Sequence, residues 1–98
     1  MPYDPVCVGL AEDVLDFLNT KYHTHFLFRT VNGKLTPHAV MILARFEEGA
    51  TPEQCRQIIV RKLREWGDND RMRKFLRPAT LFNRKNFHSY LGELGSNL

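Results

Sequence analysis

Apolar residues recur along this chain at the spacing of α-helices. The first series predicts a helix over residues 8–21 with one buried stripe. The apolar positions of this series follow i, i+4, i+7 and i+8 and are Leu10, Val14, Phe17 and Leu18. Residues 1–7 contain Pro2 and Pro5, which disfavour a helix, so we expect a flexible arm there.

The middle of the chain has the boundary signals of two consecutive helices. These signals are capping residues, N-terminal prolines and terminal glycines: Thr36, Pro37, Gly49, Thr51, Pro52, Gln54 and Gly67. The first helix is apolar around much of its circumference and should be the most buried. The second has one apolar stripe, in which Ile59 and Leu63 are expected to be fully buried. A short link at Gly49-Ala50 predicts that the two form a central antiparallel hairpin.

Residues 22–35 allow two interpretations. Phe26 and Phe28 are two positions apart, so they would share one face of a strand, and Asn32-Gly33 is a strong signal for a two-residue β-hairpin turn. The flanking segments are short, so a plain loop folded over the helices fits nearly as well.

The last third predicts a short helix, a turn and a final helix. The short helix has Met72, Phe75 and Leu76 at helical spacing and should end before Pro78. The final helix carries four apolar residues at helical spacing: Phe87, Tyr90, Leu91 and Leu94. The chain as a whole therefore predicts an all-α domain of four or five short helices over residues 8–94 and a tail at 95–98, with one small β-hairpin as the open alternative for residues 22–35.

Length and composition place the chain among ordinary globular proteins. It has 98 residues, of which 43% are hydrophobic and 26% charged, and no apolar run reaches the ~20 residues of a membrane span. The N-terminus has no basic segment typical of a signal peptide, so we expect a cytoplasmic protein in a bacterial host. Cys7 and Cys55 are too few for a disulfide framework.

Charge is distributed unevenly. Residues 1–51 carry four Lys/Arg against six Asp/Glu, whereas residues 52–88 carry ten against four. A cationic half suits phosphates or an acidic partner surface, although basic residues on solvated helix faces would give the same count. The candidate binding residues lie on consecutive short elements: Arg61, Arg64, Arg71, Arg73, Lys74, Arg77, Arg84 and Lys85. Among nearby aromatic residues, Tyr90 and His88 are expected to be exposed and Phe75 to be buried. Arg77 could equally hydrogen-bond carbonyls at a helix end.

The sequence carries no catalytic or metal-binding signature. Pairings such as Cys7 with His23 or Ser89 with His88 lie outside any motif that positions a nucleophile. His23 and His25 would share one face of a strand, but no second ligand pair accompanies them. We therefore expect no enzyme activity, no cofactor and no metal.

Short sequence motifs, which we call words, occur in a fixed order over residues 12–91. They are Phe17-Leu18-Asn19, Phe26, Ala44-Arg45, Glu48-Gly49, Thr51, Glu53, Trp66, Phe75-Leu76-Arg77-Pro78, Thr80-Leu81-Phe82, Phe87 and Tyr90-Leu91. In this order the chain resembles the conserved C-terminal domain of phage and prophage replication proteins, which often follows a winged-helix domain. That family usually has Thr-Gly after Leu-Asn, where this chain has Thr20-Lys21.

The resemblance implies a module that works beside a replicative helicase, its loader or the origin complex. The first functional expectation is thus a non-catalytic replication module that binds DNA, a replication protein or both. The alternative is a small phage protein that binds and redirects or inhibits a host protein without binding DNA. The sequence contains no winged-helix segment, which favours this alternative.

Overall fold

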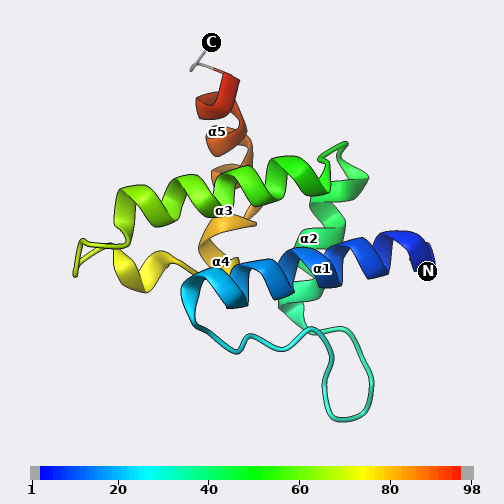
Figure 1. Cartoon of the computed structure of the whole chain (residues 1–98). Helices are drawn as coiled ribbons and strands as arrows, with labels where there is room; N and C mark the ends of the chain where they lie inside the picture. The colour runs from blue at the N-terminus through cyan, green and yellow to red at the C-terminus, as the bar shows by residue number, and fades with distance from the viewer. Residues whose placement is uncertain (1–2, 96–98) are drawn as a thin grey trace.

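Helices form nearly all the regular structure in the computed structural model, which describes residues 3–95 (Figure 1). The elements are α1 (Pro5–Tyr22), α2 (Pro37–Glu47), α3 (Pro52–Trp66), the 3₁₀ turn η1 (Arg73–Phe75), α4 (Pro78–Leu81) and α5 (Arg84–Gly95). The expected all-α class is confirmed.

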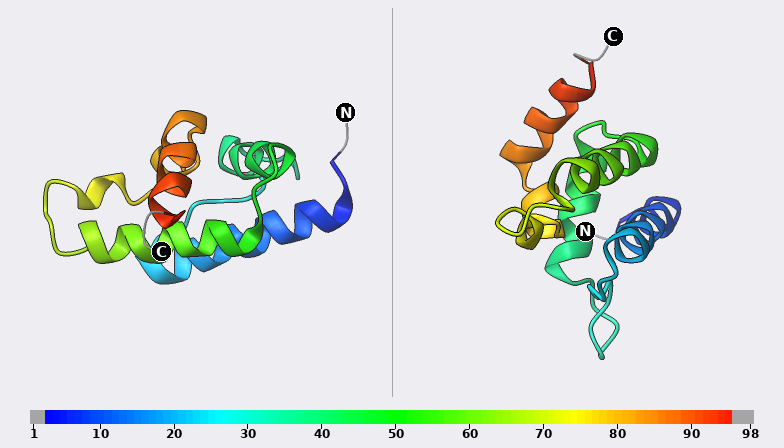
Figure 2. Two further views of the ribbon diagram at one scale, coloured as in Figure 1. Left: turned by 90° about the horizontal axis from the view of Figure 1, so that it is seen from above. Right: turned by 60° about the vertical axis from the view of Figure 1, so that its left-hand side comes forward.

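The helices pack crosswise. α1 and α3 run side by side, α2 crosses them, and α5 leads away toward the C-terminus (Figures 1 and 2). The expected antiparallel pairing of α2 with α3 is wrong, because these two helices share few contacts and each packs chiefly against α1. The link explains the change of direction. Gly49 has a φ of 104°, and the Ala50 amide donates to the Arg45 carbonyl at 3.0 Å, which turns the chain away from the α2 axis.

α1 differs from the prediction at its start and in its buried face. It begins at Pro5 because the Asp4 carboxylate accepts a hydrogen bond from the Val6 amide at 2.8 Å, so residues 5–7 are helical and do not form an arm. Its buried stripe includes Ala11 and Leu15, whereas Leu10 is 37% exposed. Residues 1–2 of the expected arm and 96–98 of the expected tail lie outside the described residues.

α3 supplies the centre of the core. Its buried positions are Cys55, Ile58, Ile59 and Lys62. Leu63 is only partly buried, so the expectation of full burial holds for Ile59 and is wrong for Leu63. Burial raises the pKa of the Cys55 thiol to about 12, which keeps this thiol protonated and unreactive at neutral pH.

The segment between α1 and α2 is a loop with a hairpin-like tip. One antiparallel bridge joins Arg29 to Leu35, and the Thr30 amide donates to the Lys34 carbonyl at 2.7 Å. Gly33 supplies the positive φ, 82°, that the turn requires. The turn therefore lies where the sequence predicts it, but the described part of the chain contains only this isolated bridge and no longer β-strand.

The region after α3 is less helical than expected. In place of a short α-helix there is only η1, and of its predicted apolar stripe Leu76 alone is buried. The Asn69 side chain stabilises the turn before η1 by accepting hydrogen bonds from the amides of Arg71 and Met72 at 2.9 and 3.1 Å. Pro78 then begins the single-turn helix α4, where we expected a turn.

Candidate nucleic-acid interface

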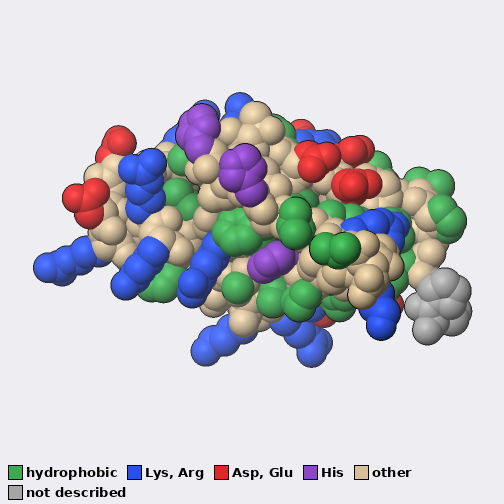
Figure 3. Space-filling view, turned by 90° about the horizontal axis from the view of Figure 1, so that it is seen from below, with side chains coloured by type: hydrophobic (Ala, Val, Ile, Leu, Met, Phe, Trp, Pro, Cys, Tyr) green, Lys and Arg blue, Asp and Glu red, His purple; other side chains and the backbone are tan. Residues whose placement is uncertain are grey.

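Four cationic side chains on and beside η1 form what we call the basic surface: Arg71, Arg73, Lys74 and Arg77. All four are exposed, and none forms an ion pair with another described residue. Figure 3 shows Lys and Arg side chains projecting from the left end and lower edge of one face, with acidic side chains beside them. Asp68 and Asp70 precede the basic surface in sequence, so cations outnumber carboxylates two to one over residues 68–77.

Local backbone structure explains why these cations point outward. A 3₁₀ turn has three residues per turn, so consecutive side chains leave it in different directions and form no single buried stripe. Pro78 restricts Arg77 to an extended backbone, with φ −155° and ψ 156°. The Arg77 Nε donates to Thr80 Oγ1 at 3.2 Å, so its partner is a hydroxyl and not one of the helix-end carbonyls considered as the alternative to phosphate.

The other four candidate cations lie elsewhere. Arg61 and Arg64 are on α3, and Arg61 Nε lies 3.1 Å from Glu65 and 3.7 Å from Glu93. Arg84 and Lys85 begin α5, and Arg84 Nε lies 3.3 Å from Glu48. Arg61 and Arg84 therefore already form ion pairs within the protein.

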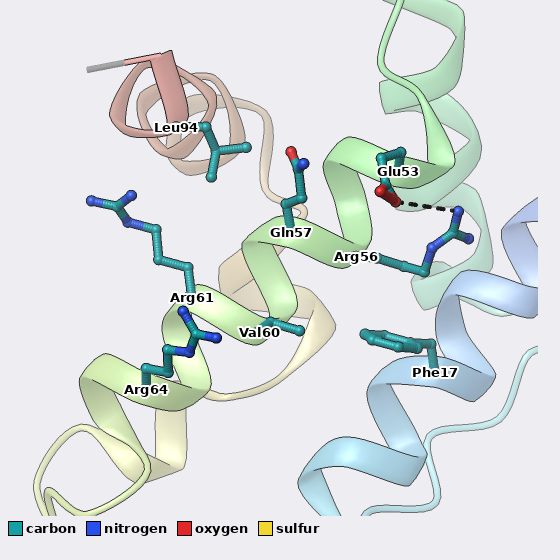
Figure 4. Close-up of a pocket in the computed structure, with 8 residues that line it drawn as sticks. All are labelled: Phe17, Glu53, Arg56, Gln57, Val60, Arg61, Arg64 and Leu94. Carbon is teal, nitrogen blue, oxygen red and sulfur yellow. Dashed lines mark ion pairs between the residues drawn. The ribbon is translucent and has the colours of Figure 1, made fainter. Parts of the chain in front are cut away.

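Arg61 and Arg64 line an open groove of about 560 Å³ along the outer face of α3. In Figure 4 the Phe17 ring from α1 faces Val60 on one side, and Leu94 from α5 lies on the other. Arg56 also lines the groove, but it pairs with Glu53 at 3.6 Å. The groove thus offers less unpaired positive charge than the basic surface.

The predicted placement of Tyr90, His88 and Phe75 is only partly correct. The Tyr90 ring lies 4.1 Å from the Lys62 ammonium and meets Trp66 edge-on, and burial raises the pKa of its hydroxyl. His88 is exposed, but its Nε2 lies 2.7 Å from Glu48 Oε1. Tyr90 and His88 are thus both engaged in contacts within the protein. Phe75, expected in the core, lies outside it.

A family model described as Conserved phage C-terminus matches residues 14–92, which include the basic surface. The chain belongs to this family. Comparisons with curated proteins and with solved structures gave no match. The family match confirms that this is a phage-conserved domain, as the resemblance implied.

One charged cluster of the phage domain joins α2 to α4 and α5. The buried Arg45 donates to the Phe82 carbonyl at 3.2 Å and to Glu48 at 3.1 Å, and Glu48 also contacts Arg84 and His88. The hydrogen bond with His88 and the charges of the two arginines hold the pKa of Glu48 below its ordinary value. Three residues of this cluster fall in the words that carry the family resemblance, but nothing in their spacing predicted that they meet.

A second cluster fixes α5 on α3 around the buried Lys62, which is 3% exposed. Its Nζ donates to Glu65 at 2.8 Å and to Glu93 at 3.0 Å. Burial alone would lower the pKa of Lys62, but the hydrogen bonds to these carboxylates outweigh burial and raise it. The hydrogen bond from Lys62 is the main reason that the pKa of Glu65 is lowered.

These shifts predict a loss of stability in acid. Because the folded protein lowers the pKa of Glu65 and Glu48, their stabilisation is complete above the ordinary value of 4.5 and is lost as the pH falls through the folded-state pKa. We expect the urea midpoint to be nearly constant between about pH 6 and 8 and to fall below about pH 4.5. The Glu65→Gln variant should show a smaller acid loss than the wild type.

The control for this experiment is Glu12→Gln, because the exposed Glu12 carboxylate forms no ion pair with a described residue. Its acid loss should equal that of the wild type. An equal loss in the Glu65→Gln protein would contradict the assigned role of the Lys62 cluster.

The structure also bears on metal and membrane binding. Within residues 3–95, no three His, Cys, Asp or Glu side chains are arranged to hold a metal ion. His23 has a φ of 58° and ends α1, so it does not share a strand with His25. None of the helices in the described part is long and apolar enough to cross a bilayer.

Proposed function

We propose that this phage domain is a non-catalytic DNA-replication module that binds DNA through the basic surface. The observation that supports this best is the group of four exposed cations within residues 71–77, none paired with a described carboxylate. The replication context rests on the resemblance to the C-terminal domain of phage replication proteins.

Cations of this kind bind phosphates and release the counterions condensed on DNA. Such contacts position a protein on the nucleic acid without reading base edges, so binding is weakly dependent on sequence. A module with this property would keep a helicase, a loader or an origin complex near DNA, while sequence recognition resides in another component.

The proposal predicts DNA binding that is strongly sensitive to salt. Four phosphate contacts give a log–log slope of about −3.6 on duplex DNA, so a rise from about 50 to 150 mM salt should weaken binding by about fifty-fold. Electrophoretic shifts of labelled duplex and single-stranded DNA of unrelated sequences at the two salt concentrations measure this effect.

Absence of a shift at about 50 mM salt would contradict the proposal. The alternative function, capture of a host protein without DNA binding, predicts that result together with a stoichiometric complex recovered from bacterial lysate. Binding that differs widely between unrelated DNA sequences would also contradict phosphate recognition.

A further inference from the structure

Phe75 is an exception among the aromatic residues of this chain. All eleven aromatic side chains lie within the described residues, and ten of them are part of the buried core or pack against it. Phe75 belongs to neither group and is partly exposed. Its spacing from Met72 and Leu76 had predicted a core position. Because the Phe75 ring is partly exposed and does not pack against the core, it is available for contacts at the surface.

The surroundings of the Phe75 ring are cationic. The Lys74 ammonium lies 5.3 Å from the ring centroid, and the Arg77 guanidinium carbon lies 5.7 Å from it. Both cations belong to the basic surface, and Lys74 forms no ion pair with another described residue. A partly exposed aromatic ring is thus placed among side chains suited to phosphates.

This combination fits single-stranded nucleic acid better than duplex. Proteins that bind single strands without sequence preference combine a positively charged surface with aromatic rings on which bases stack. In a duplex each base is already stacked between its neighbours, so a ring on the protein surface finds no free base face. Phosphates alone would need only the cations and would give Phe75 no part in binding.

We propose that Phe75 is a stacking platform for an unpaired base, with the neighbouring cations holding the flanking phosphates, and that the preferred ligand is single-stranded DNA. This inference rests on the proposed function, because the basic surface supplies the phosphate contacts. It adds a ligand class that the charges alone do not specify.

The test compares Phe75→Leu with the wild type on an oligo-dT strand and on a duplex of equal length, by fluorescence anisotropy at about 50 mM salt. Loss of one stacked base should weaken single-strand binding by about 5- to 150-fold and leave duplex binding nearly unchanged. Phe75→Tyr keeps an aromatic ring and should restore single-strand affinity. Phe17→Leu is the matched control, because Phe17 is also partly buried but lines the α3 groove.

The outcomes separate the two proposals. Unchanged single-strand affinity in Phe75→Leu, with DNA binding intact in the wild type, would overturn the stacking role and leave the proposed function standing. An equal loss on both DNA forms, or no rescue by Phe75→Tyr, would also overturn it. A wild type that binds neither form would overturn the proposed function and the stacking role together.

Discussion

Replacing Phe87 by alanine is expected to lower the free energy of unfolding by about 3–5 kcal/mol. Phe87 is completely buried, and its ring centroid lies 5.8 Å from that of Phe82. It is the one fully buried residue that α5 contributes among those described, so its removal leaves a cavity where this helix meets the core. Urea unfolding at neutral pH measures the change.

The matched control for this experiment is Phe75→Ala. The same atoms are removed, but the Phe75 side chain does not pack against the core, so this variant should lose much less stability. Equal losses in the two variants would contradict the placement of these residues. A large loss in Phe75→Ala would in addition weaken the stacking proposal, since Phe75 would then have a structural role.

Local signals in the sequence predicted where the helices α2 and α3 begin. Thr36 accepts a hydrogen bond from the Ala39 amide at the start of α2, and Thr51 forms the predicted capping box with Gln54 at the start of α3. These interactions join residues three positions apart, so sequence spacing is enough to find them.

The face of each helix that is buried depends on residues that are distant in sequence. On α3, positions 62 and 63 both continue the stripe of Ile58 and Ile59, and hydrophobicity favoured Leu63. Lys62 is buried there instead, because Glu93 and Tyr90 of α5 provide a carboxylate and an aromatic ring for its ammonium. The crossing of α2 over α3 likewise depends on contacts with α1, which no local pattern reveals.

The candidate site was predicted in part. The sequence pattern pointed to all four cations of the basic surface, but it could not show that Arg61 and Arg84 pair with carboxylates distant in sequence. It also assigned Phe75 to the core, since its spacing from Met72 and Leu76 fits an α-helix. The 3₁₀ turn that forms there is too short to bury such a stripe.

The words that carry the family resemblance lie at structural contacts as well as at the basic surface. Arg45, Glu48 and Phe82 come from three different words and meet in one cluster between α2 and α5. Asn19, from another word, accepts a hydrogen bond from the Phe26 amide at 3.0 Å. Much of the resemblance therefore reflects the fold, and binding has to be tested at the basic surface itself.

That test requires a variant that changes charge without disturbing the core. Arg71→Gln, Arg73→Gln and Lys74→Gln combined remove three cations whose side chains are exposed. The control combines Lys21→Gln, Arg29→Gln and Lys34→Gln, which changes the net charge equally at exposed positions in the other half of the chain. A general effect of net charge would appear in both proteins.

The most direct measurement is the dependence of duplex DNA affinity on salt for the wild type and these two triple variants, followed by fluorescence anisotropy from about 50 to 200 mM salt. If the basic surface binds phosphates, the negative slope of log affinity against log salt should become less steep by nearly three units in the Arg71/Arg73/Lys74 variant. In the control variant the slope should remain close to the wild-type value. Equal slopes in all three proteins, or an equal change in both variants, would contradict the basic surface as the DNA-binding site.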